Sequence, residues 1–272
     1  MEKNKVLRID VEELIRSKNP KLLKWLPRFI VSYLKKIIHQ NDVNSFIERN
    51  QDKKNQAFCK AVADEFQLDI TVSGLENIPK QGAATVVMNH PLGGMDAIAF
   101  VHQLANYRTD IKFIVNDLLL NLDGMKEMFA GVNKHGSNSL NSKKQVSELF
   151  DSDELICIFP AGLVSRKKKG QIVDLEWKKT FLTMSKKTNR PVVPVHIQGR
   201  LSNFFYNLSN FREFIGLKVN IEMLYLVNEL YKQKGQKIHF TVGKPISAET
   251  FDTSKNDKQW TEWVRGKVYE LG

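Results

Sequence analysis

Apolar and polar positions recur along the chain with two periods, one typical of strands and one typical of helices. The run "AATVVMNH" (83–90) is continuously apolar until its end, as in a buried strand, and "DAIAFVHQLAN" (96–106) has helical spacing. Further strands are predicted at 68–79, 111–117, 154–162, 190–199 and 237–247, further helices at 142–150, 176–189, 220–235 and 260–271, and a short helix or irregular segment at 122–131. Strands that alternate with helices predict an α/β fold.

The first 66 residues have helical patterns alone. They predict an N-terminal basic helical region (1–66), followed by an α/β domain (67–272). Asp10 stands in an N-cap position, and helices are expected over 20–39 and 43–66, the first of them kinked at Pro27.

The segment 20–39 combines a broad apolar face with a basic rim. Lys and Arg interrupt the apolar positions, and no acid occurs between Lys21 and Asn41. One interpretation is a helix that packs on the main domain; the other is an interfacial helix with Trp25 and Phe29 on its lipid side. Both hold if one side packs and the rim touches lipid.

Composition narrows the function classes. The 272 residues are 42% hydrophobic and carry a formal charge of +11, and residues 1–60 alone hold 14 Lys/Arg against 7 Asp/Glu. Such a surface favours nucleic acid, an anionic membrane or an acidic carrier. Nucleic acid ranks last, because no strand face interleaves basic and aromatic residues.

Several common classes lack their sequence signals. The chain contains no phosphate-binding loop, no dinucleotide fingerprint, no nucleophile elbow and no zinc-protease motif. Cys59 and Cys157 are too far apart for a metal-ligand pair and are typical of a reducing compartment. We expect no signal peptide and no membrane span, since the N-terminus is charged and no run of about 18 apolar residues occurs.

The strongest candidate chemistry lies in "NHPLGGMD", between the strand 83–90 and the following helix. His90 and Asp96 can meet only if the residues between them loop back, which Pro91 and the pair Gly93-Gly94 allow. The carboxylate would then orient the imidazole as a general base beside free N–H groups of the helix start. The alternative is a histidine that merely fills a turn.

A second candidate is "ICIFPAGLVSRKKKG", where a buried strand ends at Phe159-Pro160. One interpretation is a solvated basic loop. The other is a loop at the same sheet edge as His90, which presents Arg166 and the lysines 167–169 to an anionic head group or a carrier phosphate.

The blocks "NHPLGGMD", "KFIVND", "FPAGLVSR", "PVVPVHIQG" and "VGKPI", in this order, resemble the glycerolipid acyltransferase family of the lysophosphatidate type, over roughly residues 68–247. The resemblance implies a mixed β-sheet flanked by helices, with N-terminal helices that dock on a membrane. It implies acyl transfer from acyl carrier protein or coenzyme A to the hydroxyl of a lysolipid, without a cofactor or metal, on the cytoplasmic face of the membrane. His90 would be the base and Asp96 its orienting carboxylate. The implied substrate-binding residues are Asn89, Gly93, Gly94, Asn116, Phe159, Pro160, Gly162, Ser165 and Arg166.

The blocks depart from the usual family pattern at three points. Five residues instead of four separate His90 from Asp96, Ala161 stands where the family has glutamate, and Asn116 stands near the usual arginine. The sequence thus looks closer to the hemolysin-type branch, which includes lyso-aminolipid O-acyltransferases. We expect a lyso-aminolipid acceptor; the alternatives are 1-acylglycerol-3-phosphate as acceptor, or a non-catalytic lipid-binding protein.

Overall fold

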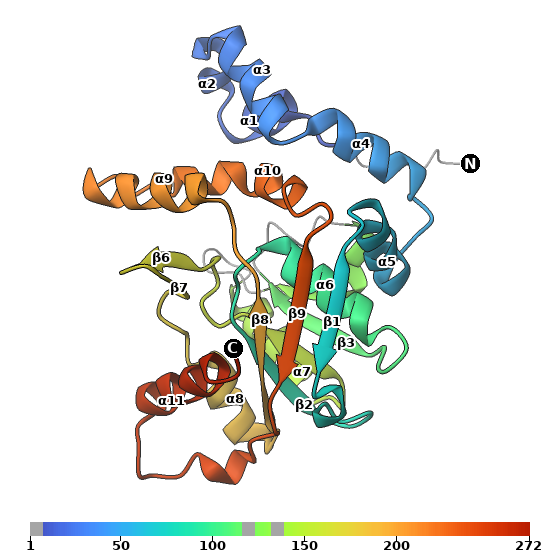
Figure 1. Ribbon diagram of the computed structural model, residues 1–272, viewed down its shortest axis with the longest axis vertical. Helices are drawn as coiled ribbons and strands as arrows, with labels where there is room; N and C mark the ends of the chain where they lie inside the picture. Colours follow the sequence, from blue (N-terminus) through green and yellow to red (C-terminus); the bar gives the residue numbers. More distant parts are fainter. Residues whose placement is uncertain (1–7, 116–122, 132–138) are drawn as a thin grey trace.

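The computed structural model describes residues 8–115, 123–131 and 139–272 (Figure 1). A seven-stranded sheet has the order β1-β9-β8-β2-β5-β3-β4. Its strands are β1 (Asp69–Ser73), β2 (Ala84–Met88), β3 (Ile111–Val115), β4 (Phe129–Gly131), β5 (Leu155–Ile158), β8 (Val192–Gln198) and β9 (Lys237–Val242). All neighbours pair in parallel except β8 and β9, which are antiparallel. The expected α/β fold with a mixed sheet flanked by helices is confirmed.

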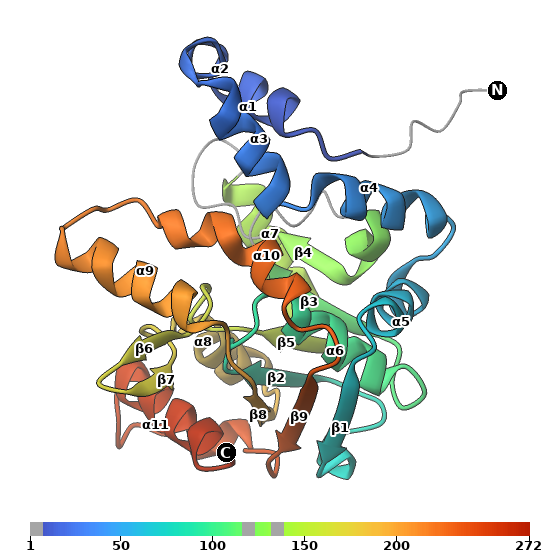
Figure 2. The same ribbon diagram turned by 45° about the horizontal axis from the view of Figure 1, so that its top comes forward.

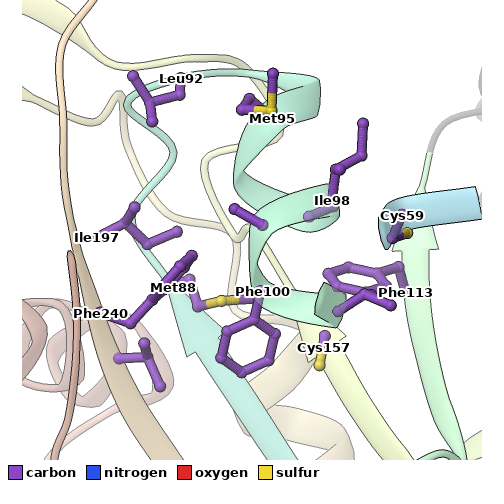
Figure 3. Close-up of a cluster of buried hydrophobic side chains, with 14 of the residues drawn as sticks. Cys59, Met88, Leu92, Met95, Ile98, Phe100, Phe113, Cys157, Ile197 and Phe240 are labelled. Atoms are coloured by element: carbon purple, nitrogen blue, oxygen red, sulfur yellow. The ribbon is translucent and has the colours of Figure 1, made fainter. Parts of the chain in front are cut away.

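Helices cover both faces of this sheet (Figure 1). The helices that do so are α5 (Asn55–Glu65) and α6 (Gly94–Leu104) on one face, and α7 (Ser139–Phe150), α8 (Thr180–Thr188) and α11 (Asp257–Tyr269) on the other. The first face buries Met88, Phe100, Phe113 and Phe240 in one cluster (Figure 3). Every residue of β2 is buried, which is why this strand is apolar without alternation.

Short 3-10 turns complete the connections: η1 (Leu75–Asn77), η3 (Asp123–Met128) and η5 (Ala248–Thr250). The strand expected over 68–79 is therefore wrong in its second half. Strand β1 ends before Gly74, which takes the left-handed conformation and leads into η1. The segment 122–131 forms η3 and then β4. Helix α7 begins three residues before the position expected from sequence.

The N-terminal region consists of α1 (Val11–Lys18), α2 (Pro20–Trp25), α3 (Arg28–Ile37) and α4 (Gln40–Arg49), which lie at one end of the molecule (Figure 1). Asp10 caps α1, as predicted. Pro27 separates α2 from α3 instead of bending one helix.

The expected helix over 43–66 is wrong, because it is two helices. Helix α4 ends before Asn50, the polar stretch 50–54 offers no apolar face, and α5 begins at Asn55, whose φ is 51°. Helix α5 buries Phe58 and Val62 in the core of the sheet, and part-buried Phe46 of α4 packs against the same core. The domain boundary at residue 66 stays a prediction.

Three further elements were not predicted as they stand. Helix α9 (Asn203–Phe214) was not predicted at all, and 220–235 is a 3-10 turn, η4 (Ile221–Tyr225), followed by α10 (Leu226–Tyr231). The basic stretch after Phe159 forms the hairpin β6 (Arg166–Lys168) and β7 (Gln171–Val173). Helices α9 and α10 lie between the sheet and the N-terminal helices in both views (Figure 1, Figure 2).

Candidate active site

His90 and Asp96 meet at the carboxyl end of β2. His90 Nδ1 lies 2.8 Å from Asp96 Oδ2, and the same oxygen accepts the backbone N–H of Leu92 at 3.0 Å. The chain turns back at Gly93, whose φ of 70° favours glycine, and α6 starts at Gly94. A Cβ on Gly93 would also lie 3.2 Å from Val164. The structure thus closes the loop that the sequence required for these two side chains to meet.

This pair has the electrostatics of an oriented base. Asp96 is completely buried, and burial raises the pKa of its carboxyl above the ordinary value, against the hydrogen bond from His90. A carboxylate only accepts, so Nδ1 carries the proton and Nε2 keeps a lone pair. The imidazole stacks on the Phe159 ring with centroids 4.1 Å apart, which fixes its plane.

Phe159 belongs to the second block, which the parallel pairing of β2 and β5 brings to the same sheet edge. The turn after β5 is closed by the N–H of Gly162, which donates to Phe159 O at 2.9 Å. Gly162 has a φ of 66°, and its backbone passes so close to Lys178 that a Cβ would lie 2.8 Å from Nζ. Pro160 is buried beneath this turn and accepts the N–H of Lys178. Phe159 therefore lies beside His90, and Pro160 and Gly162 shape the turn that follows it; their expected role in substrate binding stays a prediction.

A residue that the sequence did not single out, Asp174, holds the backbone of the base. Its Oδ1 accepts the His90 N–H at 3.2 Å and the Ser165 hydroxyl at 2.6 Å, while Oδ2 accepts Trp177 Nε1 at 2.8 Å. The Ser165 N–H donates to His90 O at 2.8 Å. Asp174 and Ser165 are both buried, so this network holds the backbone of His90 in place through its N–H and its carbonyl oxygen.

Two of the residues expected to bind substrate have their polar groups engaged within the fold, and the first is Asn89. Its amide donates to Ile197 O at 3.0 Å and accepts the Ile197 N–H at 2.7 Å, which fastens the end of β2 to β8. A buried amide engaged at both ends has little left for a ligand.

The second correction concerns Arg166. The basic stretch was expected to present it to an anionic head group, but Arg166 lies in β6 with 1% of its surface exposed. It donates to Glu222 Oε1 at 2.9 Å and to Val164 O at 2.6 Å, and Arg212 Nε donates to Glu222 Oε2 at 2.9 Å. Burial lowers the pKa of the Arg166 guanidinium, although Glu222 acts in the opposite direction. A buried, paired arginine cannot meet an incoming head group.

Of the neighbouring lysines, Lys168 pairs with Glu213, and Lys169 forms the hairpin turn with a φ of 48°. Asn116, expected near the acceptor, lies outside the described residues. Across residues 8–115, 123–131 and 139–272, no cluster of three or more His, Cys, Asp or Glu could hold a metal ion. No helix in the described part of the chain is long and apolar enough to cross a bilayer.

A model of the acyltransferase family matches residues 13–272. The chain is 46% identical over 264 residues to a lyso-glycine lipid O-acyltransferase from Bacteroides thetaiotaomicron, an alignment that covers 97% of both proteins. The chain belongs to the acyltransferase family. The expectation of an acyltransferase enzyme is thereby confirmed.

Two further relatives complete the comparison. This acyltransferase is 44% identical over 272 residues to a lyso-glycine lipid O-acyltransferase from Phocaeicola vulgatus, covering 100% of this chain and 98% of that one. Its fold resembles the crystal structure of the 1-acyl-sn-glycerophosphate (LPA) acyltransferase PlsC from Thermotoga maritima, with a TM-score of 0.50 and 20% identity over 89% of this chain and 92% of that chain. At this identity the likeness concerns the fold alone.

Proposed function

We propose that this acyltransferase moves a fatty acyl group from an acyl thioester to the hydroxyl of a lyso-aminolipid of the lyso-glycine lipid kind. The observation that carries the proposal is the 2.8 Å contact between His90 Nδ1 and buried Asp96, which leaves Nε2 as a base at the sheet edge. The lyso-glycine lipid O-acyltransferase activity for which the two full-length relatives are named supports the acceptor class.

The proposed reaction needs one base and one oxyanion site. His90 Nε2 takes the proton of the acceptor hydroxyl while its oxygen attacks the thioester carbonyl carbon. Helix α6 begins at Gly94, beside His90, and first-turn N–H groups of a helix have no intrahelical acceptor. In the proposed reaction these N–H groups stabilise the developing oxyanion. The tetrahedral intermediate then collapses, the carbon–sulfur bond breaks, and the imidazolium returns the proton to the leaving thiolate. Asp96 stabilises the imidazolium between these steps.

The charge near the proposed base argues against a phosphate on the acceptor. The Arg166 guanidinium is neutralised by Glu222 and shielded from solvent, and it is therefore not offered to a phosphate. A phosphate would therefore lose at least one charge-assisted hydrogen bond, worth roughly 1.5–3 kcal/mol. The donor, acyl carrier protein or coenzyme A, stays a prediction, as does the absence of a cofactor.

A competition assay tests the acceptor. Purified enzyme receives acyl carrier protein charged with a fatty acid, together with equal amounts of mono-acylated glycine lipid and lysophosphatidate in one tube. We expect the diacyl glycine lipid to exceed phosphatidate at least about tenfold. Preferential formation of phosphatidate would return the enzyme to 1-acylglycerol-3-phosphate, and no product from either acceptor would favour a non-catalytic lipid-binding protein.

We also propose that α2 and α3 attach the enzyme to the cytoplasmic face of an anionic membrane. Trp25 and Phe29 are exposed, Lys24 and Arg28 flank them, and Val31 on the opposite side is buried. This is the arrangement of an interfacial helix. Changing Lys24 and Arg28 to Gln should release the protein from anionic liposomes in flotation, and unchanged flotation would leave the helices a packing role alone.

A further inference from the structure

Exposed apolar side chains of large size gather in two segments of the described chain. The first segment, in α1 to α3, contains Leu14, Trp25, Phe29 and Tyr33; the second, from α9 to η4, contains Phe204, Phe211, Phe214, Ile215, Leu217, Val219 and Leu224. Scattered exposed apolar residues need no explanation, but such a concentration marks an interaction surface.

The most exposed part of the second segment is a short projection. Phe214 is 87% exposed and Val219 is 66% exposed, and Ile215 and Leu217 lie between them. We call residues 213–221 the docking tip. This stretch connects α9 to η4 and passes through Gly216, whose φ is 71°.

A buried ion pair closes the base of the docking tip. Arg212 precedes the tip and Glu222 follows it, and Arg212 Nε donates to Glu222 Oε2 at 2.9 Å. Arg212 Nη1 also donates to Leu217 O at 3.1 Å, inside the tip. The tip is thus held in one shape with its apolar side chains outside, although burying them within the molecule would be favourable.

The same ion pair ties the docking tip to the active site. Arg166 donates to Glu222 at 2.9 Å, and its chain neighbour Ser165 donates its N–H to His90 O at 2.8 Å. The path from the tip to the base therefore runs through buried, hydrogen-bonded groups. Whatever surface holds the tip is thereby held at a fixed position relative to His90.

The two exposed segments are also joined to each other. The Tyr33 and Tyr225 hydroxyls lie 2.9 Å apart, and the Tyr225 ring packs edge-on against Phe204 with centroids 4.9 Å apart. Helix α9 of the second segment lies on the side of the sheet that carries the N-terminal helices (Figure 1). The two segments can therefore meet one extended surface together.

Charge identifies that surface. Between residues 200 and 232 the three carboxylates are all paired: Glu213 with Lys168, Glu222 with Arg166 and Arg212, and Glu229 with Lys232. Lys218, at the apex of the tip, has no ion pair among the described residues, and no acid occurs in α2 or α3. In the first segment α1 carries Glu12, which pairs with Lys35, and exposed Glu13. Apolar groups whose rim is basic in excess complement anionic lipid.

We propose that the docking tip inserts into an anionic bilayer beside α2 and α3, as a second membrane anchor rigidly connected to the active site. This deepens the proposed function, because it sets the base at a fixed depth below the surface from which a lipid acceptor would enter. The occupant is the lipid surface and not a second copy of the chain.

The test measures partitioning onto vesicles that contain neither donor nor acceptor, so its outcome does not depend on the proposed acceptor. Phe214→Ser with Val219→Ser should lower partitioning onto phosphatidylcholine–phosphatidylglycerol vesicles at least about tenfold. Adding Trp25→Ser and Phe29→Ser to this variant should lower the partitioning further, by the same factor as these two substitutions produce in the wild-type protein. Unchanged partitioning of the Phe214, Val219 variant would overturn the proposal.

A charge pair supplies the matched control. Lys218→Gln should weaken binding to the anionic vesicles with little effect on pure phosphatidylcholine, whereas Lys244→Gln, an exposed lysine after β9 at the opposite sheet edge, should change neither. Equal effects of the two substitutions would contradict the tip as the point of contact.

Two further measurements separate folding and self-association from lipid binding. Phe214→Trp keeps an apolar side chain, and its added fluorescence should be quenched by brominated lipids; quenching by acrylamide alone would overturn insertion. A wild-type dimer in solution that the Phe214, Val219 variant converts to a monomer, with vesicle binding unchanged, would instead assign the tip to a second copy.

Discussion

Two pairs of ionisable side chains lie near the end of β2, His90 with Asp96 and Arg166 with Glu222, and they differ in which atoms they leave without a partner. In His90–Asp96 the carboxylate uses one oxygen on the ring, Nε2 keeps its lone pair, and Asp96 Oδ1 has no partner among the described residues. In Arg166–Glu222 both Glu222 oxygens are engaged and Arg166 is enclosed by Val164 and Phe205. A side chain can act as a base only if it keeps a free lone pair. The first pair keeps one at His90 Nε2 and can act in catalysis, whereas the second pair has none free and stabilises the fold.

Removing the base of the first pair should give the largest effect. His90→Ala should lower turnover by a factor of roughly 10² to 10⁴ with native circular dichroism, because the variant lacks the imidazole that takes the acceptor proton in the proposed reaction. His239→Ala, at the outer strands β1 and β9, is the matched control and should keep wild-type turnover. A folded and fully active His90→Ala enzyme would end the proposed mechanism.

Breaking the second pair should act on stability. Glu222→Gln leaves Arg166 and Arg212 without a counter-charge in a buried site, which should lower the free energy of unfolding by about 3–5 kcal/mol. Denaturant titration measures it. If the variant is as stable as wild type, the cluster does not hold α9 and η4 in place.

Replacing Asp174 should lower turnover, because Asp174 holds the backbone of His90 in position. Asp174→Asn keeps the shape, but its NH2 group sets a donor either against both the His90 N–H and the Ser165 hydroxyl or against Trp177 Nε1. Either orientation disturbs the network behind His90, so turnover should fall roughly tenfold to a hundredfold with little change in KM. Asp174→Glu should not restore it, since the longer side chain displaces the same contacts. A change in stability with wild-type kcat would make Asp174 a packing residue.

Asp96→Asn should raise the free energy of unfolding, whereas Glu222→Gln should lower it. Burial raises the pKa of Asp96, so its contribution to stability is present at low pH and is lost as pH rises through that raised value. Asp96→Asn should thus be modestly more stable than wild type above neutrality, with the difference vanishing in acid, while turnover falls. Unfolding midpoints across pH measure this, and a less stable variant at high pH would contradict the burial argument.

The parts predicted from sequence are those that local patterns determine. Buried strands such as β2 are continuous apolar runs, and the turn at Gly93 is visible because glycine and proline interrupt such a run. The expected meeting of His90 and Asp96 followed from that turn. The roles of the individual site residues stay predictions.

The missed parts depend on contacts far apart in the chain. Arg166 and Glu222 are 56 residues apart, and nothing local to "SRKKKG" distinguishes a buried arginine from its exposed lysine neighbours. Helix α9 was not predicted because it is apolar on two sides: Phe205 and Tyr206 face the core, while Phe204 and Phe211 face outward. Two apolar faces obscure the helical period. Asp174 has no signal of its own in the sequence.

The most direct test of the comparison measures His90→Ala and Arg166→Lys side by side, as kcat and as KM for mono-acylated glycine lipid, normalised to the folded fraction. The account predicts that His90→Ala loses product formation, whereas Arg166→Lys loses stability and retains the wild-type KM. An Arg166→Lys enzyme with native stability and a KM raised about tenfold would contradict it, because the acceptor head group would then bind Arg166.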